Sequence, residues 1–321
     1  MKKTAQLIGY AMLLYFGVMF AVEFTIVIAA EIIVMVPAII SGGDMDSALG
    51  FIQDGWFLMI TSVISSYAAA PVSAWLLLRK KPDGSFSKSR LSAGKVLMCG
   101  CVSMAALYLF GYLSQGVLWL VSKLFNTSAD QLNAVNQLSN QFTMLQYILM
   151  VCVCAPIVEE LFFRGFIIKK MLVHGELAAI TVSAFVFGLV HGTLSQIPYA
   201  LVLGVVLGYI YIRFGNIYLN IGLHMFLNFM GGVFGMLIID IPYADYIDIG
   251  ISLLFIAAAV VILIVKRKDI RINAEDELEG LTAGQQIKAV LLNPGMILFA
   301  VCCLLVMIVN LISQIWMANL L

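Results

Sequence analysis

Residues 143–163 read TMLQYILMVCVCAPIVEELFF, an apolar run that closes near two adjacent carboxylates, Glu159 and Glu160. A helix of this length rises about 30 Å, which matches the hydrocarbon core of a bilayer. Similar runs fill most of the chain, since 62% of its 321 residues are hydrophobic and only 11% are charged. Soluble globular proteins have about 45–50% apolar and about 25% charged residues. The composition therefore excludes a soluble enzyme and a disordered protein, and it indicates a polytopic membrane protein.

Short polar or charged breaks separate the apolar segments. A bilayer offers no water to unpaired backbone groups, so each segment should form a helix or be shielded by neighbouring helices. We therefore predict an all-α transmembrane helical bundle of about eight or nine spans. The segments lie at 5–40, 51–78, 94–122, 143–163, 177–193, 197–213, 216–239, 247–265 and 295–317.

The positions of the cations predict the orientation of these spans. If the N-terminus is cytoplasmic, all of the 18 Lys and Arg residues except Lys123 fall on the inner side, as the positive-inside rule requires. We expect an integral membrane protein of the plasma membrane with a cytoplasmic N-terminus. The formal net charge is zero, so no basic footprint for nucleic acid exists. The expected partners are the lipid bilayer and, at the site considered next, a peptide or protein.

Ionisable residues within an apolar span are costly unless they are paired or hydrated. Glu160 and Arg164 are one helical turn apart, which favours an ion pair, whereas Glu159 points about 100° away from Glu160. Glu159 can therefore keep its basicity while its neighbour is neutralised. The alternative is that all three lie at the inner membrane edge. We predict that this helix continues beyond residue 164 and that Arg164 is buried within the bundle.

Two of the three histidines also fall within predicted spans. His191 follows Phe187 by four residues, and His224 precedes Asn228 by four, so each pair shares a helix face. A single buried histidine is more often a hydrogen-bonded structural residue. Two histidines with an asparagine one turn away favour a site, because each would otherwise need its own buried partner. Imidazole and carboxylate together can deprotonate water, and His with Asn can stabilise an oxyanion.

Three motifs, in this order on separate apolar segments, give the chain a resemblance to a known family. Over about residues 143–239 the sequence resembles the CPBP or Abi family, which contains the type II CAAX prenyl endopeptidases. The motifs are Glu-Glu-x-x-x-Arg (Glu159, Glu160, Arg164), Phe-x-x-x-His (Phe187, His191) and His-x-x-x-Asn (His224, Asn228). We accordingly divide the chain into N-terminal spans with an outer interfacial segment (1–142), a catalytic helical core (143–239) and C-terminal spans with a cytoplasmic linker (240–321).

The resemblance implies intramembrane proteolysis by an endopeptidase. Glu159, with His191, would activate the attacking water, and His224 with Asn228 would stabilise the oxyanion. Glu160 would pair with Arg164 to fix the helix. The resemblance does not imply prenylated substrates for this chain.

The cofactor stays open at this point. Glu159, His191 and His224 would form a plausible zinc set with an open water position, and members of the family have been described both as metallopeptidases and as glutamate peptidases. A metal-free mechanism is slightly preferred, because Asn228 is a poor zinc ligand. Two other functions remain as alternatives: a catalytically idle family member acting in bacteriocin immunity or as a membrane scaffold, and a transporter with a Glu/His proton relay. Intact polar motifs argue against the first, and the lack of repeated broken-helix halves argues against the second.

Overall fold

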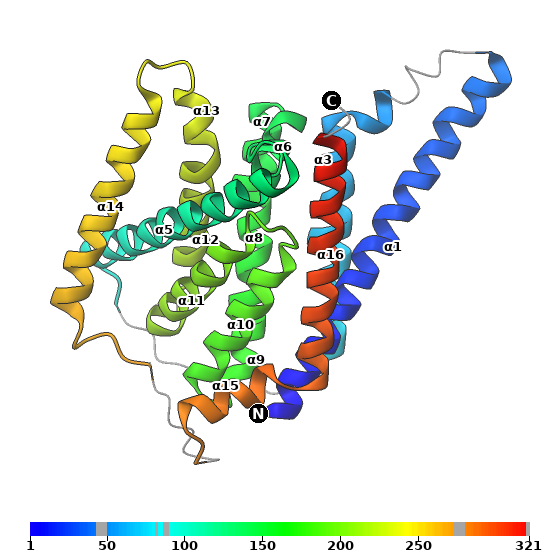
Figure 1. Cartoon of the computed structure of the whole chain (residues 1–321). Coiled ribbons are helices and arrows are strands. Elements are labelled where there is room, and N and C mark those ends of the chain that lie inside the picture. The colour runs from blue at the N-terminus through cyan, green and yellow to red at the C-terminus, as the bar shows by residue number, and fades with distance from the viewer. Residues whose placement is uncertain (43–49, 81–82, 86–89, 273–279, 319–321) are drawn as a thin grey trace.

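The computed structural model describes residues 1–42, 50–80, 83–85, 90–272 and 280–318. Every regular element in these ranges is a helix (Figure 1), which confirms the predicted all-α fold. Seven helical stretches of this part of the chain are long and apolar enough to cross a membrane. They are Lys2–Ser41 (α1), Gly55–Leu78 (α3, a π-helical turn and α4), Ala93–Phe125 (α5), Ile197–Phe214 (α11), Ile217–Ile238 (α12, a π-helical turn and α13), Ala244–Lys266 (α14) and Pro294–Ala318 (α16).

The two other predicted spans are also helical, but they do not have the form of simple transmembrane helices. The predicted span at 177–193 becomes α10 (Glu176–Val190), which has 15 residues, fewer than the about 20 needed to span a bilayer. Ten of its residues are buried on all sides by protein. A helix that is apolar all round is buried either by lipid or by protein, and composition alone does not separate these cases. The sequence-based count of spans is therefore higher than the number of simple transmembrane helices in the described residues.

The predicted span at 143–163 is an unbroken helical path that alternates between α and π geometry. Its segments are Met144–Tyr147 (α7), Ile148–Cys154 (π), Ala155–Glu159 (α8), Glu160–Ile168 (π) and Lys169–Leu172 (α9). The helix thus continues past residue 164, as predicted. π-Helical turns are rare and occur often at functional sites, and here one of them begins at Glu160.

Helix α10 and the following helix α11 form a tightly packed hairpin at the centre of the bundle (Figure 1). A Cβ atom at Gly204 of α11 would lie 2.7 Å from Ala184 Cα of α10, so only glycine permits this approach, as small residues do between membrane helices. The hairpin turn follows Val190, and α10 ends near the mid-height of α16 (Figure 1). This turn carries His191.

Partners from distant parts of the chain satisfy the polar groups of the turn. Asn310 of α16 donates a hydrogen bond to the Gly192 carbonyl at 3.0 Å. The amide of Ala134, the first residue of the short helix α6 (Ala134–Gln141), donates to Ser195 Oγ at 3.3 Å. Irregular backbone at membrane depth is tolerated only where protein or water satisfies it. Hydrogen bonds to α16 and α6 therefore hold the turn in a defined position within the bundle.

Helices α1 and α16 cross at their cytoplasmic ends, according to the predicted orientation. A Cβ atom at Gly9 would collide with the backbone of Gly295. All buried residues of α1 precede Gly17, and beyond this point α1 tilts away from the other helices (Figure 1). A short helix, α15 (Ala283–Leu291), lies across the foot of the bundle before α16 begins (Figure 1), within the region predicted to be a cytoplasmic linker.

Candidate active site

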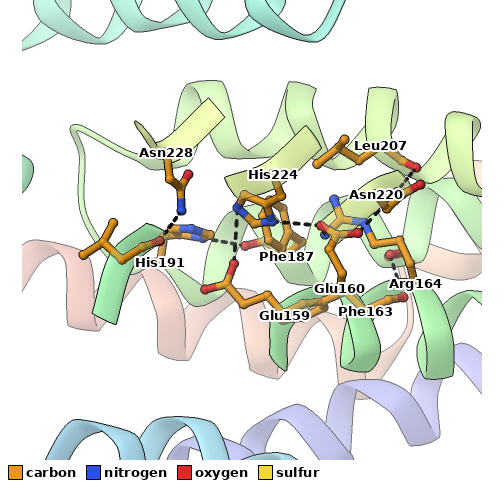
Figure 2. A network of polar contacts seen from close by, with 12 residues as sticks. Glu159, Glu160, Phe163, Arg164, Phe187, His191, Leu207, Asn220, His224 and Asn228 are labelled. Carbon is orange, nitrogen blue, oxygen red and sulfur yellow. Dashed lines mark hydrogen bonds and ion pairs between the residues drawn. The ribbon is translucent and has the colours of Figure 1, made fainter. Parts of the chain in front are cut away.

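Three helices bring the six predicted site residues together. Figure 2 shows their side chains turned toward one another. Glu159 ends α8, and Glu160 and Arg164 lie on the π-helical segment that follows. His191 directly follows α10, and the remaining two residues, His224 and Asn228, lie on α12 (Ile217–Asn228).

Glu160 and Arg164 form an ion pair inside the protein. Arg164 Nη1 lies 2.9 Å from Glu160 Oε1, and both side chains are 0% exposed. The guanidinium also lies over the ring of Phe187, with its carbon 4.2 Å from the ring centroid, a cation–π arrangement. Arg164 is thus buried in the bundle, as predicted. A buried charge is strongly destabilising without its partner, so the loss of either residue should destabilise the packing of these helices.

The same carboxylate fixes the orientation of His224. His224 Nδ1 lies 2.9 Å from Glu160 Oε1. A carboxylate paired with arginine is ionised and only accepts hydrogen bonds, so Nδ1 carries the hydrogen. The other ring nitrogen, Nε2, faces Glu159, whose Oε2 is 3.7 Å away. That distance is too long for a direct hydrogen bond, and the two groups therefore face each other without being locked together.

His191 is oriented in a similar way by backbone. Its Nδ1 lies 2.8 Å from the Phe187 carbonyl oxygen, which only accepts, so this nitrogen also carries the hydrogen and Nε2 offers a lone pair. The Phe187 ring stands edge-on to both imidazoles, with centroid distances of 5.0 Å to His191 and 5.8 Å to His224. One aromatic ring therefore fixes the relative placement of the two histidines.

Burial divides the site into an inner and an outer layer. Glu160, Arg164 and Asn220 are fully buried, whereas Glu159 retains 17% exposure. His191 and Asn228 are also partly exposed. Asn228 donates one N–H of its amide to the Val151 carbonyl at 2.7 Å, which leaves its second N–H for another acceptor. His224 links the two layers: its Nδ1 contacts the buried Glu160, and its Nε2 faces the partly exposed Glu159.

In the part of the chain that the structure describes, the donor groups of the site are not arranged as a metal site. Glu159, His191 and His224 have suitable donor atoms for zinc. Among the residues that the structure describes, however, no three His, Cys, Asp or Glu side chains form a group able to hold a metal ion.

One buried member of the network, Asn220, was not predicted from the sequence. Asn220 precedes His224 by one turn and donates to Glu160 Oε2 at 3.2 Å (Figure 2). The signal was a third polar residue at four-residue spacing in Asn-x-x-x-His-x-x-x-Asn, which places all three on one face of an otherwise apolar helix.

Comparison with known proteins supports the resemblance drawn from the motifs. Residues 141–230 match the family model described as type II CAAX prenyl endopeptidase Rce1-like. The matched segment holds all three motifs, and it confirms the similarity to CAAX protease-like membrane proteins over this part of the chain. No curated protein and no solved structure matches the chain.

Proposed function

We propose that this protein is an intramembrane endopeptidase that hydrolyses peptide bonds of membrane-associated proteins or peptides with a Glu/His-activated water. The observation that carries the proposal is the convergence of three helices: His191 and His224 both contact the Phe187 ring, and Glu159 faces His224 Nε2 beside the buried ion pair. Carboxylate and imidazole groups inside a membrane bundle are costly, and where they occur together they usually form a functional site.

Glu159 and His191 activate the water in this proposal. The Glu159 carboxylate accepts one water proton, and His191 Nε2 accepts a hydrogen bond from the other. Support comes from the Nδ1 contact of His191 with the Phe187 carbonyl, because it leaves the Nε2 lone pair free. The exposure of Glu159 supports the entry of water. The water oxygen then attacks the carbonyl carbon of the scissile bond, and the π electrons of the C=O bond move to the carbonyl oxygen.

His224 and Asn228 stabilise the resulting oxyanion. His224 donates from Nε2 in its imidazolium form, while the Glu160 carboxylate holds the hydrogen on Nδ1. Asn228 donates the N–H that Val151 does not use. The tetrahedral intermediate then collapses: the carbonyl re-forms, the C–N bond breaks, and Glu159 returns its proton to the leaving amine. The products are a carboxylic acid and an amine, and the enzyme is restored.

Glu160 and Arg164 have a supporting role. They sit too deep to meet a substrate, since neither side chain is exposed. Glu160 holds the hydrogen on His224 Nδ1, as the carboxylate of a catalytic triad does for its histidine. Arg164 keeps Glu160 ionised. We further propose a plasma-membrane location with a cytoplasmic N-terminus, on the basis of the cation distribution.

Peptides released from membranes test this function. Membranes containing the protein would be compared with membranes containing the Glu159→Ala variant at equal expression, and new peptide termini would be identified by mass spectrometry. We expect a set of termini that occurs only with the unaltered protein. A biological effect that persists in Glu159→Ala without any such termini would instead indicate an idle family member acting as a scaffold or immunity protein.

A further inference from the structure

We infer that Asn220 is a positioning residue for the proposed reaction: it holds the Glu160 carboxylate in the orientation that keeps the hydrogen of His224 on Nδ1. The effect on turnover rests on the proposed function. The position of the His224 hydrogen does not, because it can be measured without a substrate.

The Asn220 side chain is fully buried and its orientation follows from its contacts. Its Nδ2 donates to Glu160 Oε2 at 3.2 Å and to the Leu207 carbonyl of α11 at 2.8 Å (Figure 2). Both partners are acceptors only. A flipped amide would face two acceptors with its own oxygen, so the amide nitrogen has to be on this side.

Packing alone does not account for an asparagine at this position. Its Oδ1 is buried and has no hydrogen-bond partner among the described residues. An unsatisfied buried carbonyl destabilises a fold, and an apolar side chain of similar shape is often neutral or better. A leucine would lack the two donor N–H groups that Asn220 offers to Glu160 and to the Leu207 carbonyl, and of these two acceptors only Glu160 belongs to the site.

Glu160 needs this donor because its other contacts within the described part of the chain are with one of its two oxygens. Arg164 Nη1 and His224 Nδ1 both approach Oε1, each at 2.9 Å. The terminal torsion of a glutamate is broad, so partners on one oxygen leave the carboxylate plane free to turn. Asn220 binds Oε2 and fixes that plane. The carboxylate then presents Oε1 to His224 in a single direction.

The test is nitrogen NMR of the purified protein with ¹⁵N-labelled histidine. The chain has three histidines, and a His224→Gln variant assigns the signal of His224. The spectra are recorded at a pH high enough for the imidazole of His224 to be neutral, and we expect its single hydrogen on Nδ1 in the unaltered protein. In Asn220→Leu and in Asn220→Ser we expect a second population with the hydrogen on Nε2. For cleavage of an identified substrate peptide, kcat should fall about 10- to 100-fold, as for other residues that orient a catalytic group, while KM stays constant.

Asn293 provides a matched control. It is equally buried, with its Nδ2 on the Val290 carbonyl at 2.7 Å and its Oδ1 on the Met296 amide at 3.0 Å, at the start of α16. Asn293→Leu should lower the melting temperature and leave the His224 signals and kcat unchanged.

Two outcomes separate the inference from the proposed function. An unchanged His224 signal in a folded Asn220→Leu or Asn220→Ser protein would overturn the positioning role, whatever the activity. If the signal changes as expected but the unaltered protein cleaves no peptide, the positioning role stands and the proposed function fails.

Discussion

His224 and Glu160 are joined by a 2.9 Å contact between Nδ1 and Oε1, and the opposite ring nitrogen of His224 faces Glu159. Glu160 and Glu159, which are adjacent in the sequence, thus lie at opposite ring nitrogens of the same imidazole. Glu160 is fully buried and paired, whereas Glu159 is partly exposed. In the proposed mechanism, this difference in environment lets Glu160 position His224 and lets Glu159 act as the general base.

Replacement of Glu160 should damage both the fold and the site. Glu160→Gln leaves the Arg164 charge buried without its counter-ion, which typically costs about 3–5 kcal/mol. Thermal unfolding in detergent measures the loss. The control is Glu176→Gln, since Glu176 pairs with Arg213 at 2.6 Å but is partly exposed, where a loss of about 1 kcal/mol is expected. Equal losses in the two variants would contradict the account of the buried pair.

Phe187 should be more important for turnover than an equally buried phenylalanine elsewhere. Its ring contacts Arg164, His191 and His224. Phe187→Leu should therefore lower kcat about tenfold or more, because a small displacement of positioned groups is costly. Phe299 is buried in the same apolar core and stacks on Phe16. Phe299→Leu should lower the melting temperature by a similar amount with little change in kcat. A similar fall of kcat in both variants would mean that Phe187 acts only through general stability.

Asn310 should couple the last helix to the site. Its amide donates to the Gly192 carbonyl, next to His191, and its loss leaves that carbonyl unpaired at membrane depth, at a cost of about 1–3 kcal/mol. We expect Asn310→Leu to lower both melting temperature and kcat. Gln314→Leu is the control, because Gln314 lies one turn further along and bonds to Gln137 of α6 instead of the turn. If kcat survives in Asn310→Leu, this bond does not hold the His191 turn.

Metal removal should leave the activity intact. Glu159, His191 and His224 are not grouped as a metal site within the described residues, and the proposed mechanism assigns water activation to Glu159 and His191. Treatment of the purified protein with a chelator, followed by assay in metal-free buffer, should give unchanged kcat. Loss of activity that added zinc restores would show that Glu159, His191 and His224 rearrange into a metal site, and the metal-free proposal would be wrong.

The sequence predicted the helices and the spacing of the polar residues along them, since both signals are local; the roles of the six polar residues stay a prediction. Apolar length gives the helices, and a four-residue spacing places Glu160 with Arg164 on one face. The sequence did not predict that α10 is enclosed by protein, because an apolar helix has the same composition in lipid and in a bundle. Nor did it predict the π-helical turns or Asn310, which depend on contacts between segments far apart in the chain.

The most direct test of the central claim compares Glu159→Gln with Asp248→Asn in a cleavage assay with purified, reconstituted protein. Asp248 is also a carboxylate within a membrane helix, where it accepts a hydrogen bond from Tyr108 at 3.2 Å, and it has no part in the proposed chemistry. We predict that Glu159→Gln lowers kcat by about 10²- to 10⁴-fold, the usual contribution of a general base, at unchanged melting temperature, and that Asp248→Asn retains activity. Normal turnover by Glu159→Gln would contradict the claim that this carboxylate activates water.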